Sequence, residues 1–241
     1  MMAGTKAAAL PMEAIVLAGG FGTRLRHIVS DVPKPMAPMD DVGTPFLCYV
    51  LGDLARQGID RVILSTGYKS EVIEDYFGGS FQGMELVYSR EDEPLGTGGA
   101  VKLALESCRS SEVFVLNGDT FFAVNLADLR AFHREQGADF TLAMKEMFDF
   151  DRYGALEVSA GRIQAFHEKK PLHQGWINGG VYCLQRDLLS AVVRKRFSLE
   201  TDFVEKKTKQ LKICGFPSDG YFIDIGIPED YYRAKREMKL K

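Results

Sequence analysis

Short, mostly apolar runs alternate with longer amphipathic stretches through the first half of the chain. The runs predict strands at residues 14–17, 61–64, 84–88 and 113–116. Stretches of helical length lie between them, at residues 46–57, 71–77 and 98–106. Short apolar strands separated by helices are typical of a parallel sheet covered on both faces. Ligands of such sheets bind in the loops that follow the carboxyl ends of the strands.

The second half of the chain has more strand than helix. After a predicted helix at residues 126–136, strands are expected at residues 140–144, 155–158, 163–166 and 180–184. These strands either extend the sheet or form an antiparallel cap over the site. A last strand at residues 221–225 precedes a helix that begins near Pro228, with acidic residues in its first turn.

The pattern therefore predicts an α/β fold of three layers. We expect it to be Rossmann-like, with a mostly parallel central sheet and a small antiparallel cap. No internal repeat, low-complexity tract or linker divides the chain. We expect one domain over residues 12–241, preceded by a flexible leader at residues 1–11.

Composition narrows the class of partner. The chain has 241 residues, of which 46% are hydrophobic, and its formal net charge is -3, so no general basic surface for nucleic acid is expected. No segment approaches the roughly 20 apolar residues that span a bilayer, so no membrane partner is expected either. Scattered cysteines without a CxxC pair favour reduced thiols over a metal cluster, and they are Cys48, Cys108, Cys183 and Cys214. We expect a soluble cytoplasmic protein.

A glycine-rich segment follows the first predicted strand directly. Its sequence from Leu17 is Leu-Ala-Gly-Gly-Phe-Gly-Thr-Arg-Leu. Such a turn exposes backbone N–H groups that can bind phosphate oxygens. Packing is the alternative explanation for its glycines. Leu25 stands where a dinucleotide fingerprint needs glycine, and the Gly-Lys-Ser/Thr of a Walker A loop is absent.

Two basic residues strengthen the phosphate interpretation. Arg24 lies in the loop itself, and Lys34 lies between Pro33 and Pro35, which restrict the backbone on either side of it. A solvated surface charge is the alternative for Lys34. Gly-Gly-Phe-Gly-Thr-Arg-Leu followed by Pro-Lys-Pro resembles the signature of the sugar-phosphate nucleotidyltransferases, and the resemblance covers nearly the whole chain after Pro11.

That resemblance implies how the nucleotide is bound. Arg24 and Lys34 would hold the triphosphate, and the loop backbone would hold the base and phosphates. The loop residues concerned are Leu17, Ala18, Gly19, Gly20, Gly22 and Thr23. A second segment, Leu-Gly-Thr-Gly-Gly-Ala from Leu95, resembles the base-recognition segment of the family, with Thr97 and Gly98 as candidates. Its glycines could instead mark the start of a helix.

Two aspartates are candidates for a magnesium site. Asp119 follows the strand at residues 113–116 in Asn-Gly-Asp, and carboxylate oxygens are the ligands that Mg²⁺ prefers. Asp224 is a charge inside an apolar strand, where a carboxylate needs a partner. A turn residue is the alternative for Asp119, and a structural salt bridge for Asp224. Both match aspartates of the family's motifs, and Gly118 is assigned to the nucleotide with Asp119.

Three short segments resemble the family's acceptor-binding motifs. An amide or a carboxylate suits ring hydroxyls, and a lysine suits a sugar phosphate. The resemblance places the sugar phosphate in the cap, against Tyr153, Gly154, Glu168, Lys169, Asn178 and Gly179. Because Lys170 follows Lys169, the position of the phosphate-binding lysine stays open between the two.

The resemblance implies an in-line attack by the sugar phosphate on the α-phosphorus of a nucleoside triphosphate, with Mg²⁺ as cofactor and pyrophosphate as leaving group. Longer segments around Lys34, Asp119, Tyr153 and Asp224 most resemble bacterial guanylyltransferases of D-glycero-α-D-manno-heptose 1-phosphate. They imply GTP and that heptose phosphate as substrates.

Other functions remain open at this stage. Within the class, the alternatives are a mannose-1-phosphate guanylyltransferase and a hexose-1-phosphate uridylyltransferase. Outside it, the alternative is a non-catalytic module that senses a nucleotide-sugar. The presence of Arg24, Lys34, Asp119 and Asp224 argues against such a module. A homodimer is left open.

Overall fold

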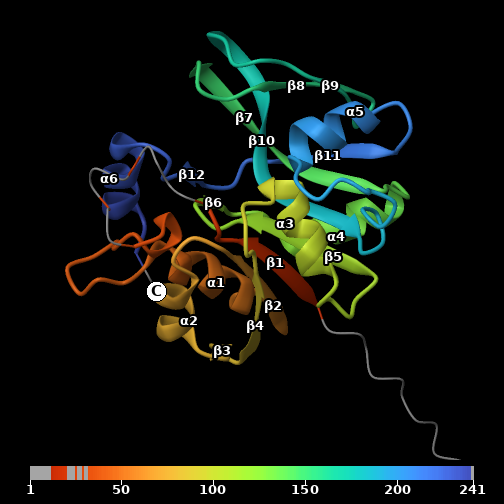
Figure 1. The fold of residues 1–241 in the computed structure, drawn as a ribbon. Coiled ribbons are helices and arrows are strands. Elements are labelled where there is room, and N and C mark those ends of the chain that lie inside the picture. Colours follow the sequence, from red (N-terminus) through yellow and green to blue (C-terminus); the bar gives the residue numbers. More distant parts are fainter. Residues whose placement is uncertain (1–11, 21–24, 26–28, 30–31, 240–241) are drawn as a thin grey trace, which may run out of the picture.

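The computed structural model describes residues 12–20, 25, 29 and 32–239; the leader expected at residues 1–11 lies outside them. Ten strands of the described chain form one sheet in the order β3-β4-β2-β1-β5-β10-β7-β11-β9-β8 (Figure 1). Their bounds are β1 Glu13–Leu17, β2 Arg61–Thr66, β3 Ser80–Phe81, β4 Met84–Arg90, β5 Glu112–Asn117, β7 Phe140–Phe150, β8 Ala155–Ser159, β9 Arg162–Phe166, β10 Leu172–Gln185 and β11 Ile213–Ser218.

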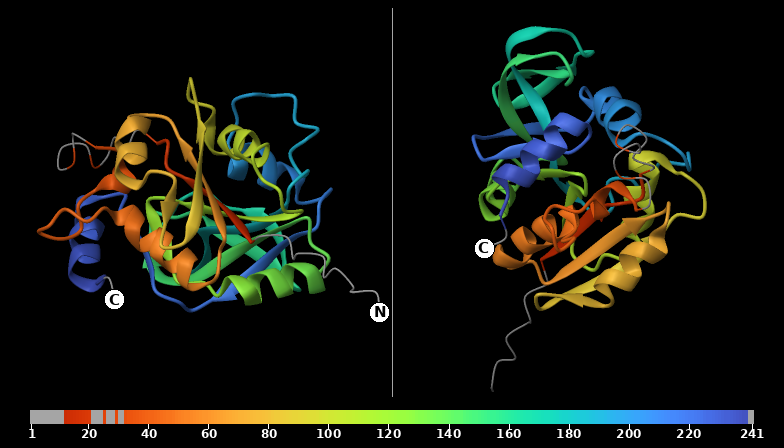
Figure 2. Two further views of the ribbon diagram at one scale, coloured as in Figure 1. Left: turned by 90° about the horizontal axis from the view of Figure 1, so that it is seen from below. Right: turned by 90° about the vertical axis from the view of Figure 1, so that its left-hand side faces the viewer.

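Helices cover both faces of the sheet, as the apolar strands require. In β1, Ala14 and Val16 face one hydrophobic core, and Ile15 between them faces the other. The first core includes residues of α1 (Phe46–Arg56), α2 (Ser70–Phe77), α4 (Leu126–Glu135) and α6 (Pro228–Glu237). The second includes residues of α3 (Gly96–Leu105) and of the π-helix η2 (Leu199–Val204). The layers are therefore helix, sheet and helix (Figure 2).

The expectation of a mostly parallel sheet is wrong for the second half of the chain. Strands β4, β2, β1 and β5 run parallel to one another, but β10 runs antiparallel to both β5 and β7. The reason is the connection between β7 and β10, which consists of the antiparallel pair β8–β9 and no helix. A parallel pair needs a long crossover, usually helical, and this segment has none. β11 does lie parallel to β7, because the chain reverses direction once more after β10, through the segment that contains η2 and α5 (Glu205–Lys207).

The outer halves of β7 and β10, together with β8 and β9, project beyond the rest of the sheet (Figures 1 and 2). Trp176 of β10 pairs with Glu146 of β7 on one side and with Leu156 of β8 on the other. The expected strands at residues 155–158, 163–166 and 180–184 therefore both extend the sheet and build an antiparallel cap.

A small separate ribbon connects the chain's end to the parallel half. β6 (Thr120–Phe122) follows β5 and pairs antiparallel with β12 (Phe222–Asp224). Asp224 is opposite Thr120 in this ladder, and α6 follows within four residues. None of the helices in the described part of the chain has the length and hydropathy that a membrane crossing requires.

Candidate active site

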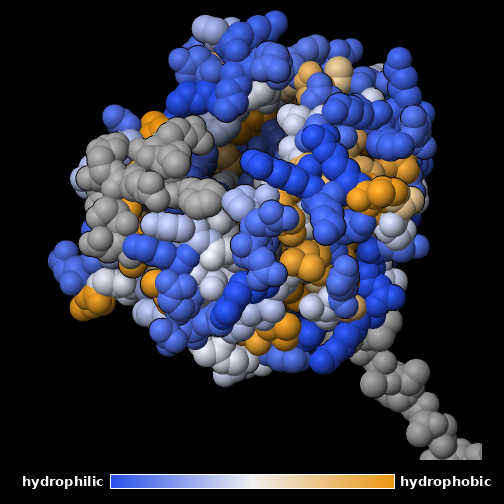
Figure 3. All heavy atoms as spheres, in the orientation of Figure 1, coloured by the Kyte–Doolittle hydropathy of each residue, from blue (hydrophilic) through white to orange (hydrophobic). Residues whose placement is uncertain are grey.

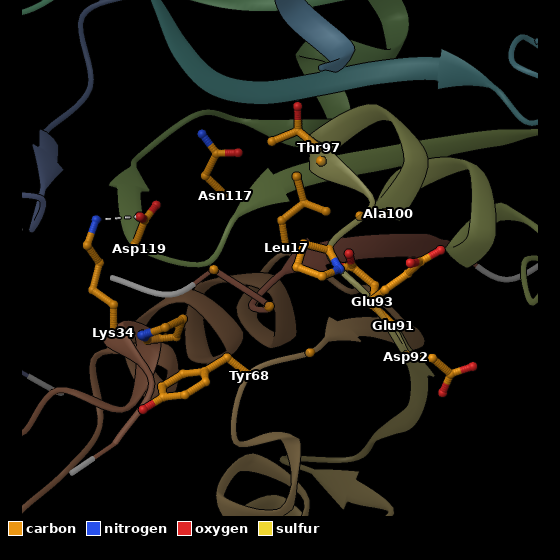
Figure 4. A pocket seen from close by; sticks show the side chains of 16 residues that line it. Leu17, Lys34, Tyr68, Glu91, Asp92, Glu93, Thr97, Ala100, Asn117 and Asp119 are labelled. Atoms are coloured by element: carbon orange, nitrogen blue, oxygen red, sulfur yellow. Dashed lines mark hydrogen bonds and ion pairs between the residues drawn. The ribbon is translucent and has the colours of Figure 1, made fainter. Parts of the chain in front are cut away.

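A cavity of about 610 Å³ opens at the carboxyl ends of β1 and β5. Six residues expected in the site line it, and these are Leu17, Gly19, Gly20, Lys34, Thr97 and Asp119. Figure 4 shows Lys34 and Asp119 pointing toward each other at one end and Glu91, Asp92 and Glu93 gathered at the other. The surface in Figure 3 is hollowed between the projecting strands and the helices below them.

Lys34 begins the short 3-10 helix η1 (Lys34–Met36), and its backbone is fixed by its neighbours. Pro33 precedes it with φ -59° and ψ 148°, and the N–H of Met36 donates to the Pro33 carbonyl. Pro35 and Met36 are buried against the body of the protein. The ammonium group is consequently held in the cavity wall, with the side chain only 9% exposed.

Asp119 lies in the turn between β5 and β6. The N–H of Gly118 donates to the carbonyl of Leu17, which ties this turn to the end of β1. Asp119 Oδ2 accepts a hydrogen bond from Lys34 Nζ at 2.6 Å, and the aspartate side chain is 35% exposed. The two residues, 85 positions apart in the chain, therefore form an ion pair at one end of the cavity.

Asp224 ends β12 beside the same turn. The N–H of Ile225 donates to the carbonyl of Asp119 at 3.1 Å, which joins the two candidate ligand segments through the backbone. Burial, together with the nearby Asp224 carboxylate, raises the pKa of Tyr153 to about 12. The Tyr153 ring packs edge-on against Phe222 of the same strand. Tyr153, a candidate sugar contact, and Asp224, a candidate metal ligand, are thus neighbours. Asp224 is not among the residues that line the cavity.

The two aspartates supply oxygen donors of the kind a hard divalent cation takes. Among the described residues, no group of three or more His, Cys, Asp or Glu side chains could hold a metal on its own. Mg²⁺ is commonly bound by one or two carboxylates, with phosphate and water oxygens completing its octahedron. Asp119 and Asp224 fit that donor set if a nucleotide supplies the remaining oxygens.

Glu91 was missed by the sequence analysis, although it lines the cavity. It follows β4, and its Oε2 accepts a hydrogen bond from the N–H of Leu95 at 2.8 Å. Burial raises the pKa of this carboxyl. A Cβ at position 19 would lie 2.9 Å from Glu91 Oε1, so the absence of a side chain at Gly19 makes room for the carboxylate.

Other lining residues lie on η1, at the end of β5, on the loops after β2 and β4 or on α3, and they are Pro35, Gly67, Tyr68, Asp92, Glu93, Pro94, Gly96, Ala100 and Asn117. The acidic group at residues 91–93 begins three positions after the end of the strand predicted at residues 84–88. The rule that ligands bind after strand ends would have singled it out.

Thr97 and Gly98 lie together at the start of α3 but face different surroundings. Thr97 lines the cavity, while its hydroxyl donates to Glu200 and accepts from the N–H of Leu199. Gly98 lies against Phe197, whose ring carbons would be 2.2 Å from a Cβ at position 98. Packing against Phe197 accounts for glycine at this position. Ala18 and Gly118 also lie next to the cavity without lining it.

The sugar candidates lie on or beside the cap. Gly154 contacts the backbone of His167, and Gly179 contacts the ring of Phe122, which belongs to β6. Asn178 lies where the β10–β7 register shifts, and it hydrogen-bonds to Tyr182. Glu168 and Lys169, like Lys170, are exposed in the connection between β9 and β10. Gly22, Thr23 and Arg24 lie outside the described residues.

The sequence profile of the Nucleotidyl transferase family matches residues 13–240. The chain belongs to this family. The resemblance that the glycine-rich loop and Pro-Lys-Pro indicated is confirmed, and so is a mixed α/β nucleotidyltransferase fold.

Two curated nucleotidyl transferases are similar over nearly their whole length. A D-glycero-alpha-D-manno-heptose 1-phosphate guanylyltransferase of Aneurinibacillus thermoaerophilus is 50% identical, with 95% of this chain and 99% of the relative covered. One of Campylobacter jejuni is 47% identical, with 92% and 97% covered. The solved structure of HddC from Yersinia pseudotuberculosis complexed with GMP-PN has a TM-score of 0.85 and 36% identity, and covers 95% of this chain and all of that one.

Proposed function

We propose that this nucleotidyl transferase is a guanylyltransferase that joins GMP, from GTP, to D-glycero-α-D-manno-heptose 1-phosphate. Pyrophosphate and GDP-heptose are the products. The observation that carries the proposal is 50% identity to a guanylyltransferase of that sugar phosphate, across 99% of the relative's length. The similarity in fold to a protein solved with the guanine nucleotide GMP-PN supports the choice of base.

The chemistry of the cavity supports guanine independently. Guanine presents two adjacent donors, N1–H and the 2-amino group, and a carboxylate accepts both. Glu91 places a carboxylate in the cavity wall, held by the N–H of Leu95. Uracil and thymine present one ring N–H between two carbonyl oxygens. A carboxylate beside this edge would repel the two carbonyl oxygens. Glu91 is therefore the proposed acceptor for the guanine edge.

The phosphates would lie at the opposite end of the cavity, where Lys34 is held. In-line transfer between phosphates needs no covalent nucleophile on the protein, so the chain's contribution is positioning and charge neutralisation. Lys34 would donate to phosphate oxygens as charge builds on the leaving pyrophosphate. Arg24, on the glycine-rich loop, is proposed for the same role.

Asp119 and Asp224 are the proposed ligands of a divalent cation, in keeping with a family that typically uses one. When bound, the cation would neutralise phosphate charge and polarise the α-phosphoryl group. The segments carrying the two aspartates are joined by the Ile225–Asp119 backbone hydrogen bond and by the β6–β12 ladder. These connections hold the backbones of the two aspartates side by side before any ligand binds.

The sugar phosphate would enter from the cap side. Asn178, Glu168 and the Tyr153–Gly154 turn are proposed for the hydroxyls, and Lys169 for the phosphate. Lys169 and Glu168 are exposed, so they have the freedom to approach a ligand from the edge of the cap. A long flexible lysine suits a point contact to a phosphate oxygen.

Incubation with GTP, Mg²⁺ and the heptose phosphate tests the proposal, with pyrophosphate release and product mass as readouts. We expect release that requires both substrates and a product with the mass of GDP-heptose. Binding of GDP-heptose without any turnover would instead support the sensing module.

A further inference from the structure

Glu200 lies behind the cavity, on η2, and its carboxylate accepts three hydroxyl hydrogen bonds. Thr97 Oγ1 and Ser198 Oγ donate to its Oε2, at 2.7 and 3.0 Å. The hydroxyl of Tyr182 donates to its Oε1 at 3.1 Å. Because a carboxylate has acceptors and no donor, each of the three hydroxyl protons is committed to Glu200.

That commitment sets the direction of the next hydrogen bond. With its proton used for Glu200, the Tyr182 oxygen can only accept, and Asn178 Nδ2 donates to it at 2.9 Å. The Asn178 Oδ1 atom must then point the other way, where it accepts the N–H of Gly180 at 3.0 Å. Two bonds therefore set the orientation of the Asn178 amide: the N–H of Gly180, which can only donate, holds its oxygen, and the Tyr182 oxygen, whose proton is used for Glu200, holds its nitrogen.

Tyr182 is a rigid intermediate in this series. Its side chain is fully buried and its ring packs against Phe140, with centroids 5.3 Å apart. Asn178 lies at the register shift of β10, and Gly180, at φ 73°, brings the backbone against the side chain of Asn117. A Cβ at position 180 would lie 2.6 Å from Asn117 Nδ2. Since Asn117 lines the nucleotide cavity, this bulge borders it.

The other end of the series lies in the cavity wall itself. Thr97, in the first turn of α3, lines the cavity and donates to Glu200. The N–H of Gly98 donates to the carbonyl of Phe197, so the segment that leads into η2 is fastened to the start of α3. Thr97, Glu200, Tyr182 and Asn178 thus connect the nucleotide side of the site with the sugar side.

We propose that Glu200 is a positioning residue that orients the Asn178 amide toward the sugar and couples it to the nucleotide-binding end of α3. Asn178 then offers one remaining N–H and one carbonyl lone pair to the ring hydroxyls, in a fixed order. The proposal rests on the proposed function, because it takes Asn178 as a sugar contact.

Steady-state kinetics of three variants test it. Tyr182→Phe keeps the buried ring and removes the link, so KM for the sugar phosphate should rise about tenfold while KM for GTP stays within about twofold. Glu200→Leu removes the acceptor for Thr97 as well, so both KM values should rise. Glu200→Gln retains an oxygen that can accept from Tyr182 and should restore most of the affinity for the sugar phosphate. Glu205→Gln, at an exposed position of α5, is the matched control.

The double variant Glu200→Leu/Tyr182→Phe separates positioning from general damage. Both changes act on the sugar through one hydrogen-bonded series, so the rise in KM for the sugar phosphate should not exceed that of the worse single variant. Strictly additive effects in folded protein would overturn the proposal.

A readout without turnover keeps this test distinct from that of the proposed function. The side-chain amide signals of Asn178, assigned in ¹⁵N-labelled protein by comparison with Asn178→Asp, should shift in Tyr182→Phe and Glu200→Leu and stay in place in Glu205→Gln. Unchanged signals in the first two variants would refute the positioning role, whatever the substrates are. Absence of turnover in the wild-type protein with shifted amide signals would refute the proposed function alone.

Discussion

Lys34 and Asp119 form an ion pair whose two members are proposed to bind different ligands. When the substrates bind, the Lys34–Asp119 pair would be replaced by two new ion pairs. Lys34 would pair with phosphate oxygens, and Asp119 would pair with the cation. Each charge would gain a new partner as it loses the old one, so the exchange leaves neither Lys34, only 9% exposed, nor Asp119 unpaired. The pair also aligns both charges at the end of the cavity where the phosphates are proposed to bind.

Asp119→Asn and Asp224→Asn test the proposed metal site. Each change removes a carboxylate while preserving shape, so each should abolish most turnover with the fold intact. The double variant should be little worse than either single variant, because ligands of one cation act as a unit. The measurement is kcat at saturating Mg²⁺, with circular dichroism as the control. Near-normal turnover in either single variant would remove that aspartate from the site.

Lys34→Ala tests the role of the ammonium group. A donor that stabilises transition-state charge typically supplies roughly 3 kcal/mol, or about a hundredfold in rate. We expect a loss of that order, chiefly in kcat, and no loss for Lys209→Ala, which changes an exposed lysine elsewhere. A rise in KM for GTP with kcat unchanged would instead show that Lys34 binds ground state and transition state alike.

Glu91→Gln tests the proposed guanine contact. One acceptor is replaced by a donor that would face the guanine N–H groups, so kcat/KM for GTP should fall at least about tenfold while that for UTP changes less. Asp92→Gln, a neighbouring carboxylate in the same wall, is the control. Equal losses for both nucleotides would contradict a contact to the base.

Because the pKa of Glu91 is raised, the affinity for GTP should depend on pH in a direction that can be stated. Guanine donors bind the ionised carboxylate, so GTP affinity should weaken as the pH falls through the pKa of Glu91, which burial raises from its ordinary value. KM for GTP measured against pH should show this step in the wild-type protein and lack it in Glu91→Gln. The same step in both proteins would assign it to another group.

At the scale of elements, the start of α3 depends on a close contact between helix and loop. Glycine inside a helix normally costs about 0.5–1 kcal/mol relative to alanine, so Gly98→Ala would stabilise an isolated helix. Here the added Cβ would meet the buried ring of Phe197 and lie 3.0 Å from the backbone nitrogen of Leu199. Overpacking of this kind costs about 1–3 kcal/mol, which is more than the helix gains from alanine. The substitution should therefore destabilise the protein.

We therefore expect Gly98→Ala to lower the melting temperature and to raise KM for GTP, because α3 carries part of the cavity wall. Gly79→Ala has open space around the added methyl group and should leave both quantities unchanged. The measurement is thermal unfolding followed by circular dichroism, with kinetics on the same samples. If Gly98→Ala were as stable as the wild type, the Phe197 ring would have to be able to move aside for the added methyl group, contrary to this prediction.

Elements differ in how far their sequence predicts them. β1, β2 and β5 are buried on both faces and β4 keeps a short apolar run, so all four stand out and their predicted bounds lie within two residues of the structure. β11 was missed because Gly215 and Pro217 interrupt its pattern, and pairing with β7 overrides their low strand propensity. β10 was predicted only from residue 180, because glycines at the bulge conceal its first part.

At the scale of the whole molecule, the family and the parallel half of the sheet followed from local patterns, whereas the joining of the two halves did not. The antiparallel insertion of β10 between β5 and β7 depends on pairings with residues 65 to 73 positions away in β5 and 22 to 44 positions away in β7, which no local pattern encodes. The same limit applies to the site. Motifs predicted Lys34 and Asp119 singly, but their ion pair, and the approach of Glu91 to Gly19, arise only when distant loops meet.

The proposed function is defined by the pair of substrates that the assembled site accepts. A site that hydrogen-bonds the one additional hydroxyl of a manno-configured heptose leaves its polar groups unpaired when mannose binds, which can cost several orders of magnitude in specificity. A site that merely has room for the heptose discriminates by only about 1–3 kcal/mol.

The most direct test is kcat/KM with GTP for D-glycero-α-D-manno-heptose 1-phosphate and for mannose 1-phosphate, followed by all four triphosphates with the better sugar. We predict the heptose phosphate with GTP as the best pair, with mannose 1-phosphate detectably slower. Equal or higher efficiency with mannose 1-phosphate, or a preference for UTP or dTTP, would contradict the account.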